Sequence, residues 1–115
     1  MLKKQNRLGR SDSLKQVIRR GRITRGPGFL FRTLATHPLP PRFAVSISHK
    51  AEKSAVRRNR VRRQLYGILR DHITEITPGL DCSITVQRPA CIMSAADRKK
   101  TFLQLLVHAK LLAKQ

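Results

Sequence analysis

Three stretches of the chain carry hydrophobic residues at helical spacing. In the first, Leu14, Val17 and Ile18 follow a serine that can cap a helix and precede Gly21, so a short helix is predicted over residues 12–20. Two longer stripes predict a central helix and a last helix. They consist of Val61, Leu65, Ile68, Leu69 and Ile76, and of Phe102, Leu105, Leu106, Ala109 and Leu112.

The ends of the two longer helices follow from residues that start or stop helices. The central helix is predicted to open at residues 52–54 and to end at Pro78-Gly79. Ser94, with Asp97 three residues later, resembles a capping box and marks the start of the last helix.

Alternation of period two predicts the strands. Phe43, Val45 and Ile47 alternate with small polar residues and give the clearest strand. Further strands are predicted over residues 29–35 and 81–87, the second closed by Arg88-Pro89, because proline cannot donate to a β-ladder. A short strand around residues 22–24 and a proline-rich turn over residues 37–41 complete the set.

This order of elements predicts an α+β fold in one small domain. The order is α-β-β-(β)-α-β-α, in which two or three strands precede the central helix and the helices pack on one sheet. Residues 1–10 are basic and poor in apolar side chains, which predicts an extended or frayed arm. We expect residues 11–115 to form a single domain, because a length of 115 residues is typical of one small domain.

The charge balance points to a polyanionic partner. The chain has 25 Lys and Arg residues against 6 Asp and Glu, a formal net charge of +19 and a sequence pI near 11.8. Such an excess repels itself in a compact domain unless a polyanion neutralises it, so nucleic acid is the first hypothesis. No apolar run has a membrane-spanning length, and no signal-peptide pattern follows the basic start, so we expect a soluble, cytoplasmic protein without membrane contact.

The acidic residues argue against a protein active site. Protein-catalysed phosphodiester cleavage usually needs clustered carboxylates that hold two metal ions, or a histidine pair for acid–base chemistry. The six acids and four histidines are scattered singly, apart from Asp71 beside His72, which point about 100° apart on a helix. We therefore predict no catalytic residue and no metal bound by the protein. Cys82 and Cys91 have no CxxC spacing and no Cys/His cluster around them, so we predict free thiols.

The densest functional signal is the segment of residues 50–63, which carries seven basic residues against the single acid Glu52. At 100° per residue its arginines cover the outward half of the central helix, where planar guanidinium groups can meet phosphate oxygens and stack on bases. Asn59 either contacts a base edge or ribose, or makes a local hydrogen bond to the helix. The candidate RNA-binding residues are Lys50, Lys53, Arg57, Arg58, Asn59, Arg60, Arg62, Arg63 and Arg70.

The run of residues 55–63, AVRRNRVRR, preceded by SISHK at residues 46–50, resembles the signature of the bacterial ribonuclease P protein subunit. The similarity covers nearly the whole chain, from the Asn6-Arg7-Leu8 run to the strand that closes with Arg88-Pro89. It implies a subunit that binds a large catalytic RNA through the RNR helix and the 5′ leader of precursor tRNA through a cleft between the first helix and the sheet. A left-handed crossover around the RNR helix is also implied.

The same resemblance implies which side chains line the leader cleft. The family's first helix usually presents aromatic residues there; this chain has Leu14 and Ile18 instead, and the nearest aromatic replacements lie on the next strand. The candidate cleft residues are Leu14, Lys15, Ile18, Phe29, Phe31 and Arg32.

Catalysis in that family belongs to the RNA, with Mg²⁺ held by the RNA–substrate complex and no cofactor bound by the protein alone. The implied function is the non-catalytic subunit of an endoribonuclease that removes the 5′ leader of precursor tRNA. The expected partners are the catalytic RNA and precursor tRNA, with no obligate protein partner. The alternative is a structural RNA-binding protein such as a ribosomal protein, which would share the charge and the arginine helix but would need no leader cleft.

Overall fold

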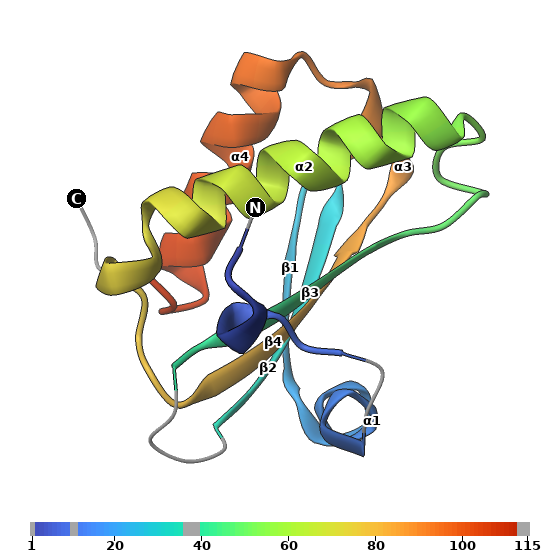
Figure 1. Ribbon diagram of the computed structural model, residues 1–115. Helices are drawn as coiled ribbons and strands as arrows, with labels where there is room; N and C mark the ends of the chain where they lie inside the picture. The colour runs from blue at the N-terminus through green and yellow to red at the C-terminus, as the bar shows by residue number, and fades with distance from the viewer. Residues whose placement is uncertain (1, 10–11, 36–39, 113–115) are drawn as a thin grey trace.

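A four-stranded sheet in the order β1-β2-β4-β3 organises the protein (Figure 1). The computed structural model describes residues 2–9, 12–35 and 40–112. The strands are β1 (Arg22–Gly26), β2 (Phe29–Ala35), β3 (Arg42–Ile47) and β4 (Leu80–Val86). The helices are α1 (Asp12–Arg20), α2 (Ala55–Asp71), α3 (Arg88–Ile92) and α4 (Ala95–His108), with short 3₁₀ turns η1 (Lys4–Asn6) and η2 (Ile73–Glu75).

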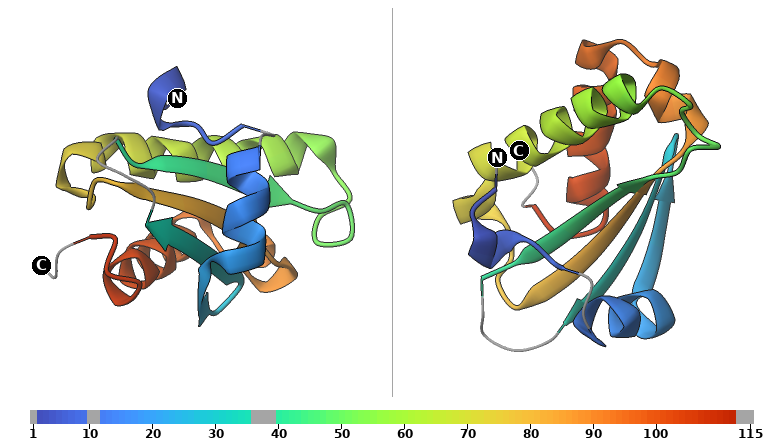
Figure 2. Two further views of the ribbon diagram at one scale, coloured as in Figure 1. Left: turned by 90° about the horizontal axis from the view of Figure 1, so that it is seen from below. Right: turned by 45° about the vertical axis from the view of Figure 1, so that its right-hand side comes forward.

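The connection between β3 and β4 has the unusual hand. β1, β2 and β4 pair antiparallel, whereas β3 pairs parallel to β4 and α2 joins the two. Seen from the side of α2 with both strands pointing upward, β4 lies to the left of β3 (Figures 1 and 2). The crossover is therefore left-handed, whereas about 98% of such connections are right-handed. The left-handed crossover that the family resemblance implied is thus confirmed.

The two faces of the sheet carry different layers. Phe29 and Phe31 pack against Phe102 of α4, with ring centroids 5.4 and 5.6 Å apart, in the core that α2 and α4 cover. The opposite face is covered by α1, whose Val17 is fully buried (Figure 2). Hydrophobic alternation in the strands thus leaves α1 on one side and the two long helices on the other.

The edge of β3 is covered rather than open to solvent. The backbone N–H of Leu8 donates to Phe43 O at 2.7 Å, and the Asn6 amide donates to Pro41 O at 2.9 Å. Leu2 and Leu8 are buried with Asn6. The expected frayed arm is therefore wrong for residues 2–9, because this segment supplies hydrogen bonds that an edge strand would otherwise lack.

Tyr66 of α2 completes the cover of that edge, since its Oη accepts a hydrogen bond from the Val45 backbone N–H at 3.1 Å. Replacing Tyr66 with Phe keeps the ring but leaves this N–H without its acceptor. We expect the free energy of unfolding to fall by about 1 to 3 kcal/mol, the cost of an unsatisfied buried donor. Urea denaturation with an unchanged m-value measures the effect, and an unaltered midpoint would show that solvent satisfies the Val45 N–H equally well.

Most predicted elements are present, with differences at their ends. The predicted strand at residues 22–24 extends to Gly26, and the central helix ends at Asp71 instead of Pro78. The 3₁₀ turn η2 follows without a buried residue, and the buried Ile76 lies beyond it, outside any helix. Residues 37–39 of the predicted turn lie outside the described residues.

The short helix α3 was not predicted, because Arg88-Pro89 was interpreted only as the end of a strand. Proline in the first turn of a helix favours a helix start as well, and Pro89 is the second residue of α3. Gly28, with φ +80°, lies so close to Ala90 that any side chain at this turn would collide with α3. The β1–β2 turn and α3 are therefore packed directly against each other.

Candidate nucleic-acid interface

Helix α2 presents its basic residues on the side away from the sheet. Ser54 caps its N-terminus by accepting a hydrogen bond from the Arg57 N–H at 3.3 Å. The apolar residues Val61, Leu65, Ile68 and Leu69 are buried. The exposed polar positions of the helix are Arg57, Asn59, Arg60, Arg63, Arg70 and Asp71, so the predicted division into a core face and a cationic face is present.

Three candidate arginines have partners within the protein. Arg58 donates to the backbone oxygens of Glu52 and Lys53 at 2.7 and 3.0 Å, so it closes the loop before α2. Arg62 donates to Asn59 Oδ1 at 2.9 Å, and the exposed Arg70 lies 3.4 Å from Asp71.

Of the two predictions for Asn59, the structure shows the local one, because its side chain accepts a hydrogen bond from Arg62 of the same helix. The cations left free to meet a polyanion are Lys50, Lys53, Arg57, Arg60 and Arg63, while Arg62 is held in place by Asn59.

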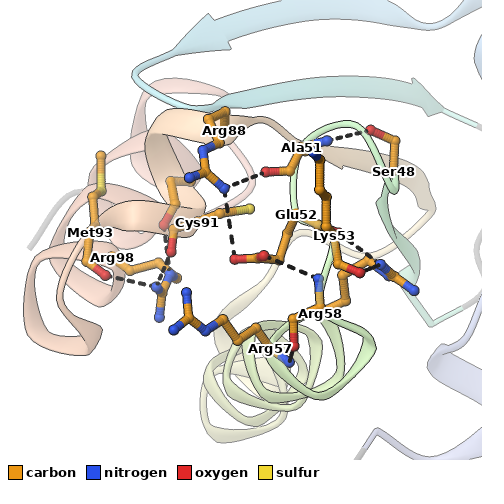
Figure 3. A network of polar contacts seen from close by, with 12 residues as sticks. Ser48, Ala51, Glu52, Lys53, Arg57, Arg58, Arg88, Cys91, Met93 and Arg98 are labelled. Carbon is orange, nitrogen blue, oxygen red and sulfur yellow. Dashed lines mark hydrogen bonds and ion pairs between the residues drawn. The ribbon is translucent and has the colours of Figure 1, made fainter.

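A polar network joins the start of α2 to α3 and α4 (Figure 3). Arg98 of α4 is 8% exposed and donates to the backbone oxygens of Ala90, Cys91 and Met93 at 2.8 to 3.1 Å, and to Gln64 Oε1 at 2.8 Å. These acceptors are neutral, and burial lowers the pKa of Arg98 below its ordinary value. Sequence analysis missed this residue, because nothing local distinguishes a structural arginine from the basic surface.

The loop before α2 holds the one buried glutamate of the described residues. Glu52 is 6% exposed and accepts a hydrogen bond from the Ser54 N–H at 3.2 Å, while its other oxygen lies 3.9 Å from Arg88. Burial raises the pKa of the nearby Cys91 thiol, and the negative charge of Glu52 raises it further. The sequence showed Glu52 only as an isolated acid.

The α1 side of the sheet carries most of the predicted cleft residues. Ile18 is 53% exposed, Leu14 is half-buried and Lys15 is exposed. Arg32 of β2 is half-buried and lies beside the C-terminal end of α1, next to Gly21. The structure therefore brings these four residues to the same face of the sheet.

Ile23 of β1 was not predicted to belong there. It pairs with Arg32 across the strands, so both side chains point to the α1 face, and it is 48% exposed. The sequence signal that could have identified it is a single isoleucine between the polar residues Arg22 and Thr24 of a predicted strand.

The assignment of Phe29 and Phe31 to the cleft is wrong. Both rings are almost completely buried, at 1% and 0% exposure, and both contact Phe102 on the opposite face from α1. Residues 29 and 31 share one face of β2, whereas Leu30 and Arg32 share the other. No aromatic side chain of β2 is therefore available to the α1 side.

The described residues contain no group of side chains that is suited to bind a metal ion. No three His, Cys, Asp or Glu side chains within these ranges are grouped so that they could hold an ion. Cys82 is buried and Cys91 half-buried, and both are free thiols. No described helix has the length and hydropathy of a bilayer span.

Comparisons with known proteins agree with this architecture. The family model of ribonuclease P matches residues 2–110. The ribonuclease P protein component of Rippkaea orientalis is 30% identical over 96% of this chain and 91% of its own length, and that of Geobacillus kaustophilus is 31% identical over 91% and 87%.

Solved structures share the fold. The RNase P protein of Staphylococcus aureus superposes with a TM-score of 0.86 at 21% identity, over 95% of this chain and 99% of that one. The RNase P protein of Thermotoga maritima gives 0.78 at 18% identity, over 89% and 96%. The match to the family model spans almost the whole chain and the curated relatives cover it at 30% identity or above, so this chain belongs to the ribonuclease P protein component family.

Proposed function

We propose that this subunit of ribonuclease P binds the catalytic RNA with the exposed cations of α2 and the 5′ leader of precursor tRNA with the α1 side of its sheet. The observation that carries the proposal is the placement of these two surfaces on opposite sides of the sheet (Figure 2). Two RNA chains can therefore contact the protein at the same time. One is met mainly by guanidinium groups and the other by Ile18, Leu14 and the polar residues around them.

In this proposal the protein does not carry out the chemistry. The RNA would position the scissile phosphate and hold Mg²⁺ ions, which would supply an activated water and stabilise the leaving oxygen. The protein contributes positive charge, which lowers the repulsion between two RNA chains, and contacts that add affinity for the leader. The scattered acids of the sequence are consistent with this division of labour.

Reconstitution tests the proposal directly. We expect RNA-free protein to leave precursor tRNA intact with Mg²⁺ present, because it lacks clustered carboxylates. Addition of the catalytic RNA at a low Mg²⁺ concentration should produce cleavage that depends on the protein. The assay measures release of the 5′ leader on a gel, with heat-denatured protein as the control. Cleavage by rigorously RNA-free protein, or equal cleavage with and without it, would overturn the proposal.

A further inference from the structure

A hollow of about 370 Å³ lies between the start of α2 and α3, beside the cationic face. It is lined by Glu52, Arg57, Arg60, Val61, Cys91, Ile92 and Arg98. Its volume falls at the lower end of the range of small-molecule sites, roughly 300 to 1,000 Å³, which suits a single nucleotide. Ile92, which is 67% exposed, gives the hollow an apolar wall at its rim.

The carboxylate of Glu52 faces this hollow with unused hydrogen-bonding capacity. Oε2 accepts one bond from Ser54, and Oε1 lies 3.9 Å from Arg88 Nη1, which is too far for a hydrogen bond. Arg98 does not neutralise it by direct contact, because its donors go to Gln64 and to backbone oxygens. A buried carboxylate in this state favours a ligand that brings N–H donors.

The rim of the hollow carries the opposite charge. Arg57 and Arg60 of α2 line it, and Figure 3 shows the Arg57 side chain reaching from α2 toward α3, alongside Glu52. A free phosphate would meet the arginines but would be repelled by the carboxylate. A nucleotide satisfies both, because its base can donate inward while its phosphate remains among the guanidinium groups.

We propose that this hollow binds an unpaired guanine nucleotide of the catalytic RNA, with Glu52 accepting from the base and Arg57 and Arg60 holding its phosphate. Guanine is the base that offers two adjacent donors, N1–H and the N2 amino group, on its Watson–Crick edge. Adenine, cytosine and uracil each offer a donor at only one position of that edge, so they cannot make two parallel hydrogen bonds to a carboxylate. This inference rests on the proposed function, because the nucleotide is taken to belong to the catalytic RNA. It adds selectivity for a base to the phosphate contacts proposed for α2.

Nuclear magnetic resonance titration of the full chain with GMP and AMP tests the inference. We expect GMP to shift the backbone amides around Glu52, Cys91 and Ile92, and to bind about 10-fold more tightly than AMP, as a bidentate base contact predicts. Inorganic phosphate, titrated separately, should bind more weakly than GMP. Equal affinities for GMP and AMP, full competition by phosphate, or shifts confined to residues outside the hollow would each overturn the inference.

Two variants test whether Glu52 causes the preference for GMP over AMP and whether Arg57 binds the phosphate. Glu52→Gln should remove the preference for GMP, because the amide group replaces one acceptor with a donor, whereas Glu75→Gln removes the same charge at the exposed η2 and should keep it. Arg57→Ala should weaken GMP and AMP equally. Thermal melting accompanies each variant, and if Glu52→Gln fails to fold, the GMP-to-AMP ratio of the native protein still decides.

Binding of the catalytic RNA in the same buffer separates the two hypotheses. Salt-sensitive RNA binding without a GMP preference would refute the guanine site and leave the proposed function standing. A GMP preference in a protein that does not bind the catalytic RNA would refute the proposed function and the RNA source of the nucleotide, while the guanine selectivity of the hollow would stand.

Discussion

Binding of the protein to the catalytic RNA is expected to weaken about 250- to 1000-fold when monovalent salt rises from about 50 to about 200 mM. The cations of α2 and the loop before it that remain free, with Arg62, allow five or six phosphate contacts. Each contact contributes about −0.7 to −0.9 to the slope of log K against log salt, so the slope should be on the order of −4 to −5. Filter binding or fluorescence anisotropy across a salt series measures it.

Paired substitutions locate the contacts. Arg60→Ala with Arg63→Ala should make the slope shallower by roughly 1.5 to 2, because two phosphate contacts are lost. Arg19→Ala with Arg20→Ala removes the same charge from α1, on the other side of the sheet, and should change the slope little when no precursor tRNA is present. A native slope shallower than about −2, or equal effects of the two pairs, would show that the α2 face does not bind the RNA.

Replacing Ile18 with Ala should reduce affinity for leader-bearing precursor tRNA about 5-fold to 100-fold, while leaderless tRNA binds nearly as before. Contact between a side chain and a base is worth roughly 1 to 3 kcal/mol, and Ile18 is the most exposed apolar residue of α1. Because about half of its surface is already in water, the truncation should cost the fold little. Binding to the reconstituted holoenzyme with both tRNAs measures the ratio.

The exposed Val56 provides the control for this substitution. Val56→Ala removes aliphatic surface from α2, on the opposite side of the sheet, and should leave the ratio of the two affinities unchanged. Phe31→Ala would not serve this purpose, because truncating a fully buried ring is expected to cost about 3 to 5 kcal/mol of stability. If Ile18→Ala weakens both tRNAs equally, the leader does not contact α1.

Local patterns were sufficient for features that depend on neighbours in sequence. The spacing of Leu14, Val17 and Ile18, with Gly21 after them, predicted α1 with its observed ends. The buried stripe and cationic face of α2 followed from 100° per residue. The crossover hand came only from resemblance to a family, because hydrophobic alternation in β3 and β4 is the same for either hand.

Features that depend on distant residues could not be predicted. Alternation in β2 separates Phe31 from Arg32, but it does not show that Phe102, some seventy residues later, covers the phenylalanine side. The buried state of Arg98 likewise depends on backbone oxygens of the loop before α4 and on Gln64 of α2. In both cases tertiary packing determines the partner, and a short stretch of sequence contains no information about it.

The cover over the β3 edge also has a consequence for the order in which the molecule assembles. Residues 2–9 are translated before the strands that they contact, since the surface that they join includes Pro41 and Phe43, and β3 is held in place by pairing with β4 at residues 80–86. Residues 2–9 must therefore wait until β3 and β4 have paired before they dock. During that interval the backbone of β3 is free to pair with a second nascent or refolding chain. The yield of refolding should accordingly fall as protein concentration rises, although residues 2–9 and Tyr66 contact this edge in the described part of the folded chain.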